Sequence, residues 1–166
     1  MMLIKRMFFA LALALAAGCG GTGPAVHGAE PASPAAPAPD GAGETFQSPA
    51  GGTVQLDPKH LKRRTLLVFA ADFCPVCRRE TPAIVDLARE LRGKVDVVGV
   101  VMDGERDAAK RYVTAHDVDY PTIWDPEWRF AMRYKVRSTP TLVLLATDGT
   151  VEATAGGLTE ALKKKL

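Results

Sequence analysis

This chain of 166 residues has only three cysteines, few long hydrophobic runs and no large excess of charge of either sign. The 21 basic and 19 acidic residues leave a net charge of +2, which gives no electrostatic reason to expect a nucleic-acid partner. A zinc site needs four ligands, and beyond one close cysteine pair the candidate ligands show no paired spacing: Cys19, His27, His60 and His116. We therefore expect no bound metal and no other cofactor.

The longest apolar run lies near the start of the chain. Lys5 and Arg6 precede residues 7–17, which are too few to cross a bilayer core of about 30 Å but have the length of the hydrophobic part of a secretory leader. We expect residues 1–18 to be a signal peptide and the chain to be exported. Cleavage after Gly18 would remove two basic residues and no acidic one, which leaves the charge of the remainder balanced.

Cys19 follows this run directly. Residues 15–19, Leu-Ala-Ala-Gly-Cys, resemble a bacterial lipobox, in which the cysteine is lipidated and becomes the mature N-terminus. Ala16 stands where the lipobox pattern usually has Leu, and the alternative is a plain signal peptide that leaves or removes Cys19. Lipidation would also account for the odd cysteine in an exported chain of three. The expected location is extracytoplasmic, anchored to a membrane and facing the periplasm or the cell exterior.

Residues 19–43 are rich in proline, alanine and glycine and contain almost no large apolar side chain. Such a segment cannot bury a core, so we expect a flexible linker. The remaining residues, 44–166, are enough for one α/β domain. Sequence patterns predict its strands at 45–47, 53–56, 66–70, 95–102, 141–145 and 151–155, and its helices from 75 to about 92, from about 105 to 116, at 128–134 and from Thr159 onward.

The connections between these elements have recognisable signatures. Residues 48–52 are typical of a turn, so the first two strands should form a hairpin, and Asp148-Gly149 predicts a second hairpin near the C-terminus. A strand, a helix and another continuous apolar strand between residues 66 and 102 predict a parallel βαβ unit.

The main candidate site is the sequence Cys74-Pro75-Val76-Cys77, at the junction between a predicted strand and a predicted helix. Pro75 suits the first helical position, which places Cys74 at the N-cap beside unpaired amides and the positive end of the helix dipole. Such positions lower a cysteine pKa from about 8.5 to roughly 3.5–7.5 and favour the nucleophilic thiolate. We therefore predict that Cys74 attacks disulfides and that Cys77 resolves the mixed disulfide. A structural disulfide or half of a zinc knuckle are the alternatives.

Residues 69–82 resemble the active-site segment of the thioredoxin superfamily, in its TlpA/ResA/DsbE-like branch of extracytoplasmic thiol-disulfide oxidoreductases. The similarity extends from about Thr45 to the C-terminus. It implies a thioredoxin-like α/β fold: a central mixed sheet flanked by helices, with an N-terminal β-hairpin and an αβ insertion, which residues 103–126 resemble.

The resemblance also implies roles for single residues. Thr139-Pro140 corresponds to the loop with a cis-proline that packs against the cysteines, and Glu80 to a carboxylate that tunes the thiols or takes a proton from Cys77. The implied substrate contacts are Phe73, Pro75, Val76 and Thr139. The chain departs from the pattern at Phe73, where Trp is usual, and at Val68, where thioredoxin has a buried Asp; the second departure favours a role for Glu80.

The function implied is the reduction of disulfides in exported proteins, for example in cytochrome c maturation or metal-site assembly. We expect the protein to be a monomer, and a thiol protein of the membrane to reduce its cysteines again after each reaction. The Pro-Val dipeptide between the cysteines does not decide the direction of electron flow. Two alternatives belong to other classes. The two thiolates could carry Cu(I) in a metallochaperone. The chain could also be a thiol peroxidase of the peroxiredoxin type, although the residues before Cys74 lack the pattern of those enzymes.

Overall fold

The computed structural model describes residues 43–166, which form two β-sheets and four helices. The strands are β1 (Glu44–Gln47), β2 (Thr53–Leu56), β3 (Thr65–Ala70), β4 (Asp96–Val101), β5 (Thr122–Trp124), β6 (Thr141–Leu145) and β7 (Val151–Ala155). The helices are α1 (Pro75–Glu90), α2 (Arg106–Ala115), α3 (Arg129–Arg133) and α4 (Glu160–Lys163). The expected signal peptide, Cys19 and the linker up to residue 42 lie outside the described residues.

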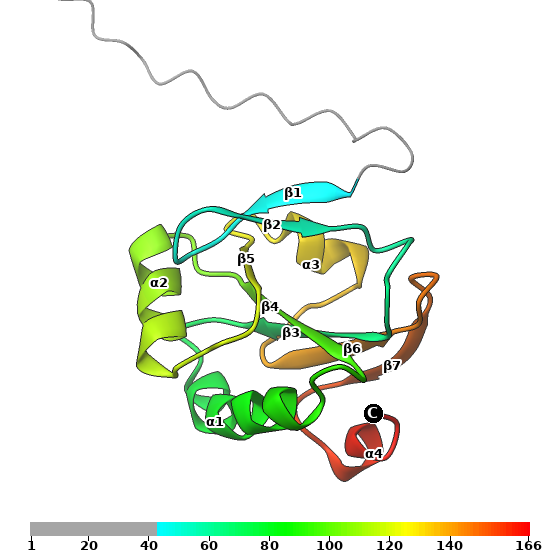
Figure 1. The fold of residues 1–166 in the computed structure, drawn as a ribbon. Coiled ribbons are helices and arrows are strands. Elements are labelled where there is room, and N and C mark those ends of the chain that lie inside the picture. Colours follow the sequence, from blue (N-terminus) through cyan, green and yellow to red (C-terminus); the bar gives the residue numbers. More distant parts are fainter. Residues whose placement is uncertain (1–42) are drawn as a thin grey trace, which may run out of the picture. The chain divides into compact units, whose positions relative to one another are not determined.

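The main sheet has five strands in the order β5-β4-β3-β6-β7, and Figure 1 shows it between helices. β3, β4 and β5 are parallel to one another, whereas β6 is antiparallel to β3 and β7 to β6. The parallel pairs follow from the crossovers through α1 and α2, because parallel neighbours need a long connection. The predicted mixed sheet, the βαβ unit and the terminal hairpin are confirmed.

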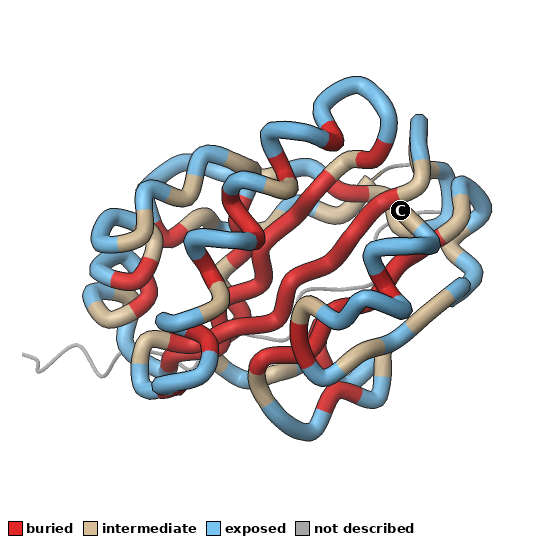
Figure 2. The backbone as a smooth tube through the Cα atoms, turned by 90° about the horizontal axis from the view of Figure 1, so that it is seen from below, coloured by how far each residue is buried: buried red, intermediate tan, exposed pale blue. Residues whose placement is uncertain are grey.

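Each face of the sheet has its own core because side chains alternate along a strand. On one face, Leu66 and Val68 of β3 pack against α1 and α4. On the other face, Leu67 and Phe69 pack against α3 and the β1-β2 hairpin. Every residue of β3 and β6 is buried, as the red central strands of Figure 2 show. The continuous apolar runs in the sequence reflect this burial on both faces.

The predicted hairpin of β1 and β2 is present as a separate two-stranded antiparallel sheet. Thr159 caps α4 as predicted, with its side chain accepting a hydrogen bond from the N–H of Leu162. α2 ends at Ala115, one residue before the predicted His116, which is the C-cap. Within residues 43–166, no helix combines the length and the apolar character that crossing a membrane would require.

Candidate functional site

Cys74 and Cys77 form a disulfide at the start of α1. Residues 71–73 connect the buried end of β3 to Cys74, whose φ and ψ of −88° and 108° are those of an N-cap. The Cys74 Sγ accepts a hydrogen bond from the backbone N–H of Cys77 at 3.1 Å. Both cysteines are buried, and Cys74, at 6% exposed, is the more exposed residue of the two, since Cys77 is 1% exposed.

The position of Cys74 at the N-cap of α1 favours the thiolate form. The first N–H groups of α1 have no partner within the helix, and the one that reaches the Cys74 sulfur would stabilise negative charge there. Pro75 occupies the first helical turn, where its missing N–H costs nothing. The local geometry therefore favours Cys74 as the nucleophile of the pair.

The Thr139-Pro140 loop lies against the disulfide. The peptide bond between these two residues is cis. The carbonyl oxygen of Thr139 is 3.4 Å from the Cys74 Sγ and can accept a hydrogen bond from this group when it is a thiol. Pro140 is buried and Thr139 half-buried, and Thr141 begins β6 immediately afterwards. The central strand β6 thereby positions a loop that is 65 residues away from Cys74 in the sequence.

Apolar side chains next to the disulfide face solvent. Phe73 is 62% exposed and Val76 is 36% exposed, and Pro75 between them is also exposed. Large exposed apolar side chains at a reactive group are typical of a surface that contacts another molecule. Three of the four residues expected to touch substrate, Phe73, Pro75 and Val76, are therefore exposed on one loop and helix start, and the fourth, Thr139, is half-buried on the loop before β6.

Glu80 lies in the second turn of α1 and is half-buried. Its Oε2 accepts a hydrogen bond from the N–H of Leu158 at 3.0 Å, in the loop between β7 and α4. The neighbouring Gly157 has φ +139°, and a Cβ there would lie 2.7 Å from the same oxygen. The carboxylate is thus held between α1 and the C-terminal loop.

The sequence patterns did not indicate a second acidic residue, Asp103, as part of the site. Asp103 follows β4 and is 4% exposed, and its Oδ2 accepts a hydrogen bond from the N–H of Asp72 at 2.8 Å. Burial raises the pKa of Asp103, although the N–H groups of Asp72 and Phe73 act in the opposite direction. A sequence signal existed, because the carboxyl ends of parallel strands share one edge of a sheet and Asp103 directly follows such a strand.

Two hydroxyl groups connect α2 to the first turns of α1. Thr81 Oγ1 donates to the carbonyl oxygen of Cys77 at 2.6 Å and is also hydrogen-bonded to the Tyr112 hydroxyl. Since the Cys77 carbonyl can only accept, Tyr112 must donate to Thr81. Burial raises the pKa of Tyr112, so the hydroxyl keeps its proton at neutral pH. Helix α2, which lies in the expected insertion of residues 103–126, is therefore linked to the backbone of Cys77 through Thr81.

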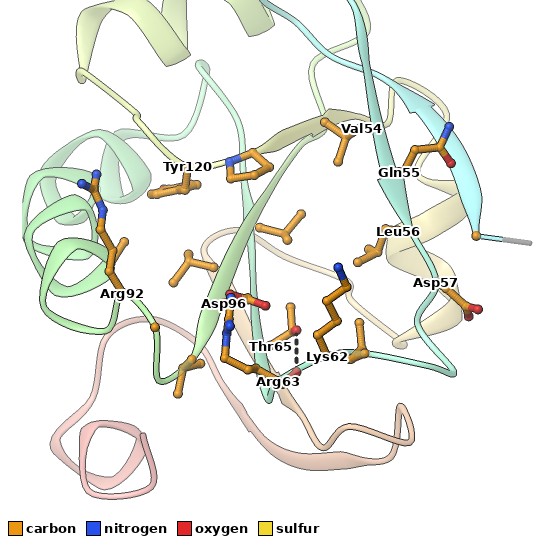
Figure 3. A pocket seen from close by; sticks show the side chains of 18 of the residues that line it. Val54, Gln55, Leu56, Asp57, Lys62, Arg63, Thr65, Arg92, Asp96 and Tyr120 are labelled. Carbon is orange, nitrogen blue, oxygen red and sulfur yellow. Dashed lines mark hydrogen bonds and ion pairs between the residues drawn. The ribbon is translucent and has the colours of Figure 1, made fainter.

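A cleft of about 810 Å³ lies elsewhere in the fold, as Figure 3 shows. It is lined by residues of β2, the beginning of β4, the end of α1 and the loop 119–121. Arg63 and Asp96 pair within it at 2.8 Å. Neither cysteine lines this cleft. The redox pair thus lies apart from this cleft, next to the exposed side chains of Phe73 and Val76.

Among residues 43–166, no group of three or more His, Cys, Asp and Glu side chains lies close enough together to hold a metal ion.

Comparison with known proteins agrees with this geometry. The sequence pattern of the AhpC/TSA family matches residues 34–154. A thioredoxin-like protein of Haemophilus influenzae is 34% identical over 116 residues, which cover 69% of this chain and 67% of that protein. A thiol-disulfide oxidoreductase ResA of Oceanobacillus iheyensis is 29% identical over 63% of this chain and 55% of its own length. The matched region thus spans between about half and two thirds of these relatives.

The fold also has solved counterparts. A secreted disulfide oxidoreductase of Mycobacterium tuberculosis, described as homologous to Escherichia coli DsbE, superimposes with a TM-score of 0.61 at 22% identity. The superposition covers 70% of this chain and 84% of that one. At this identity the likeness shows the thioredoxin-like architecture.

Proposed function

Because the chain belongs to the AhpC/TSA family and carries a thiol-disulfide oxidoreductase domain of thioredoxin-like fold, we propose that it reduces disulfides of exported proteins while anchored to a membrane through Cys19. The observation that carries the proposal is the Cys74-Cys77 disulfide at the N-terminus of α1, with the Thr139 carbonyl beside the Cys74 sulfur.

The reaction begins with both cysteines reduced. The Cys74 thiolate attacks one sulfur of the substrate disulfide, forms a mixed disulfide and releases the other substrate sulfur as a thiolate. Cys77 then loses its proton and attacks the Cys74 Sγ, which releases the second substrate thiolate. The substrate has gained two electrons and leaves as two thiolates, which take up the one proton released by Cys77 and a second proton from solvent, and Cys74 and Cys77 end as a disulfide. A thiol protein in the membrane would return the pair to the dithiol.

Glu80 is the proposed acceptor of the Cys77 proton. Its place one helical turn beyond Cys77 and its partial burial support this role, and the Leu158 N–H occupies one of its two oxygens. A carboxylate has further lone pairs, so it can hold Leu158 and take a proton at the other oxygen.

Substrate binding would use the apolar surface around the pair. Phe73 and Val76 offer exposed apolar contact, and the backbone at Thr139 can pair with an extended segment of the substrate. We propose as substrates the disulfides of exported apocytochromes or of metal-site assembly proteins, provided that they lie in segments that can extend along this surface.

The reduction potential of the Cys74/Cys77 couple tests the direction of electron flow. We expect a potential of about −200 mV or lower, toward the roughly −270 mV of thioredoxin, after equilibration with defined thiol-disulfide buffers. A potential near about −120 mV would make the protein an oxidant and would overturn the proposal. Consumption of peroxide by the reduced protein without a disulfide substrate would instead identify a peroxidase.

A further inference from the structure

We propose that Asp103 is a positioning residue for the redox pair, because its buried carboxylate holds the loop that presents Cys74. The inference rests on thiol-disulfide exchange at Cys74 and is independent of the identity of the substrate and of the direction of electron flow.

The end of β4 brings Asp103 under this loop. The N–H of Met102 donates to the carbonyl of Ala70 at 3.0 Å, which keeps β3 and β4 together up to their last residues. Asp103 comes next, and Trp124 Nε1 of β5 donates to its carbonyl oxygen at 2.8 Å. The backbone of Asp103 is therefore held by neighbours on two strands before its side chain makes any contact.

The side chain binds the middle of a tight turn. The N–H of Cys74 donates to the carbonyl of Ala71 at 3.2 Å, so residues 71–74 form a closed turn between β3 and α1. Asp103 Oδ2 accepts the N–H of Asp72 at 2.8 Å, and the N–H groups of Asp72 and Phe73 both act to lower the pKa of this carboxyl against the effect of burial. A displacement of the turn would move the Cys74 sulfur away from the Cys77 N–H and the Thr139 carbonyl.

Other contacts to the same turn are exposed. Arg78 donates to the carbonyl oxygen of Asp72 at 2.6 Å, and Arg111 pairs with the Asp72 carboxylate at 3.4 Å. Arg111 is 65% exposed in its side chain, and Arg78 is also exposed, so water can replace either contact at low cost. Asp103 is 4% exposed, so water replaces its contact less easily, and loss of its side chain would leave the part-buried N–H of Asp72 without this acceptor.

Two neutral substitutions separate the hydrogen bond from the charge. Asp103→Asn keeps an oxygen that can accept the N–H of Asp72, whereas Asp103→Ala removes it, and both lack the negative charge. The matched control is Asp125, which is 7% exposed and accepts the N–H groups of Phe130 and Ala131 at 3.2 and 2.9 Å in α3. Asp125→Asn and Asp125→Ala test whether the loss of any buried carboxylate that accepts backbone N–H groups has the same effect.

The experiment measures two properties of the reduced full chain: the rate of exchange with glutathione disulfide and the pH midpoint of Cys74 thiolate formation, followed by ultraviolet absorbance. We expect Asp103→Ala to exchange about tenfold more slowly than Asp103→Asn, since misplacement of a reacting group by about 1 Å can cost up to 10²-fold. Its pH midpoint should also lie higher, because the hydrogen bond from the Cys77 N–H to the thiolate is weakened. The Asp125 pair should show no difference in either property.

Equal rates and midpoints for the two Asp103 variants would overturn the inference, as would a difference of the same size in the Asp125 pair. If Asp103→Ala does not fold, the inference is tested instead by hydrogen exchange of the Asp72 amide in the wild type and in Asp103→Asn. Protection in both supports the inference, and rapid exchange in both contradicts it. A wild-type protein that does not exchange at all would contradict the function itself, which is a separate result.

Discussion

At the scale of single residues, Cys74 and Cys77 differ in what surrounds their sulfurs. The Cys74 sulfur accepts a hydrogen bond from an N–H of α1 and faces the Thr139 carbonyl, whereas Cys77, in the first turn of α1, is almost fully buried. A nucleophile must reach its substrate, and a resolving thiol must only reach its neighbour. The proposed division of roles between the two cysteines therefore agrees with their difference in exposure.

Serine substitutions test these roles. Cys74→Ser should abolish exchange, because the accessible nucleophile is lost, and Cys77→Ser should accumulate mixed disulfides through Cys74. Non-reducing electrophoresis and mass spectrometry of the trapped species measure both effects. Turnover that persists in Cys74→Ser would show that the assignment is reversed.

Glu80→Gln tests the proposed proton acceptor. Glutamine keeps an oxygen for the Leu158 N–H but cannot take a proton, so we expect release of the mixed disulfide to slow by roughly 10²-fold with little loss of stability. Stopped-flow measurement of the resolution step across pH gives the effect. Glu90→Gln, at an exposed position on the same helix, is the control. Equal rates in the two variants would rule out the proton transfer.

At the scale of elements, the ends of helices determine the local geometry around the site. α1 begins at the redox pair, and its second turn holds the loop before α4 through Glu80 and Leu158. α4 is only four residues long, so it depends on its cap and on the packing of Leu162 against the sheet. The C-terminal helix is the element most sensitive to a lost cap.

Thr159→Ala should destabilise the protein by about 1 kcal/mol, the usual cost of removing an N-cap. The Thr159 side chain accepts the Leu162 N–H at 3.2 Å, and alanine leaves this group to water. Urea unfolding measures the change. Thr114→Ala is the matched control, because this hydroxyl donates to Lys110 within α2 and caps nothing. A loss of stability as large in the control would show that the cap is not the cause.

At the scale of the whole molecule, Phe130 of α3 connects three parts of the fold. Its ring centroid lies 5.0 Å from that of Phe46 in the hairpin and 6.3 Å from that of Phe69 in the central strand. Phe130 is 2% exposed, so this contact is part of the core on the hairpin side of the sheet. The small β1-β2 sheet is attached to the main sheet largely through this cluster.

Phe130→Ala should lower the free energy of unfolding by about 3–5 kcal/mol, through lost transfer energy and the cavity that remains. Met132→Ala, on the same helix but 62% exposed, should change it by no more than about 0.5 kcal/mol. Denaturant titration of both variants measures the difference. Similar values for the two positions would contradict the role of Phe130 in holding the parts together.

The proposed membrane attachment is also a property of the whole chain, and it would depend on Cys19, which lies outside the described residues. Cys19→Ser should move the protein from the membrane fraction to the soluble fraction, because a serine cannot carry the thioether-linked lipid. Fractionation and intact mass measure this. Cys74→Ser is the control and should stay attached. A Cys19→Ser protein that remains in the membrane fraction would contradict lipidation.

The sequence by itself determined the order and type of the main elements and the place of the cysteines between a strand and a helix. These features depend on local periodicity, on Pro75 at the helix start and on Asp148-Gly149 in a turn, and such signals act over a few residues. The cis peptide bond at Pro140 was expected from the family resemblance and not from local sequence.

Only the tertiary structure decided which distant groups meet at the pair. Asp103 reaches Asp72 across 31 positions and Glu80 reaches Leu158 across 78, and no sequence pattern indicated either contact; the contact of Thr139 with Cys74 across 65 positions was implied by the family resemblance alone. Tyr112 and Thr81 likewise meet through packing of α2 against α1. Periodicity shows which face of an element is buried, but these contacts depend on strand order and register, which join segments far apart in the chain.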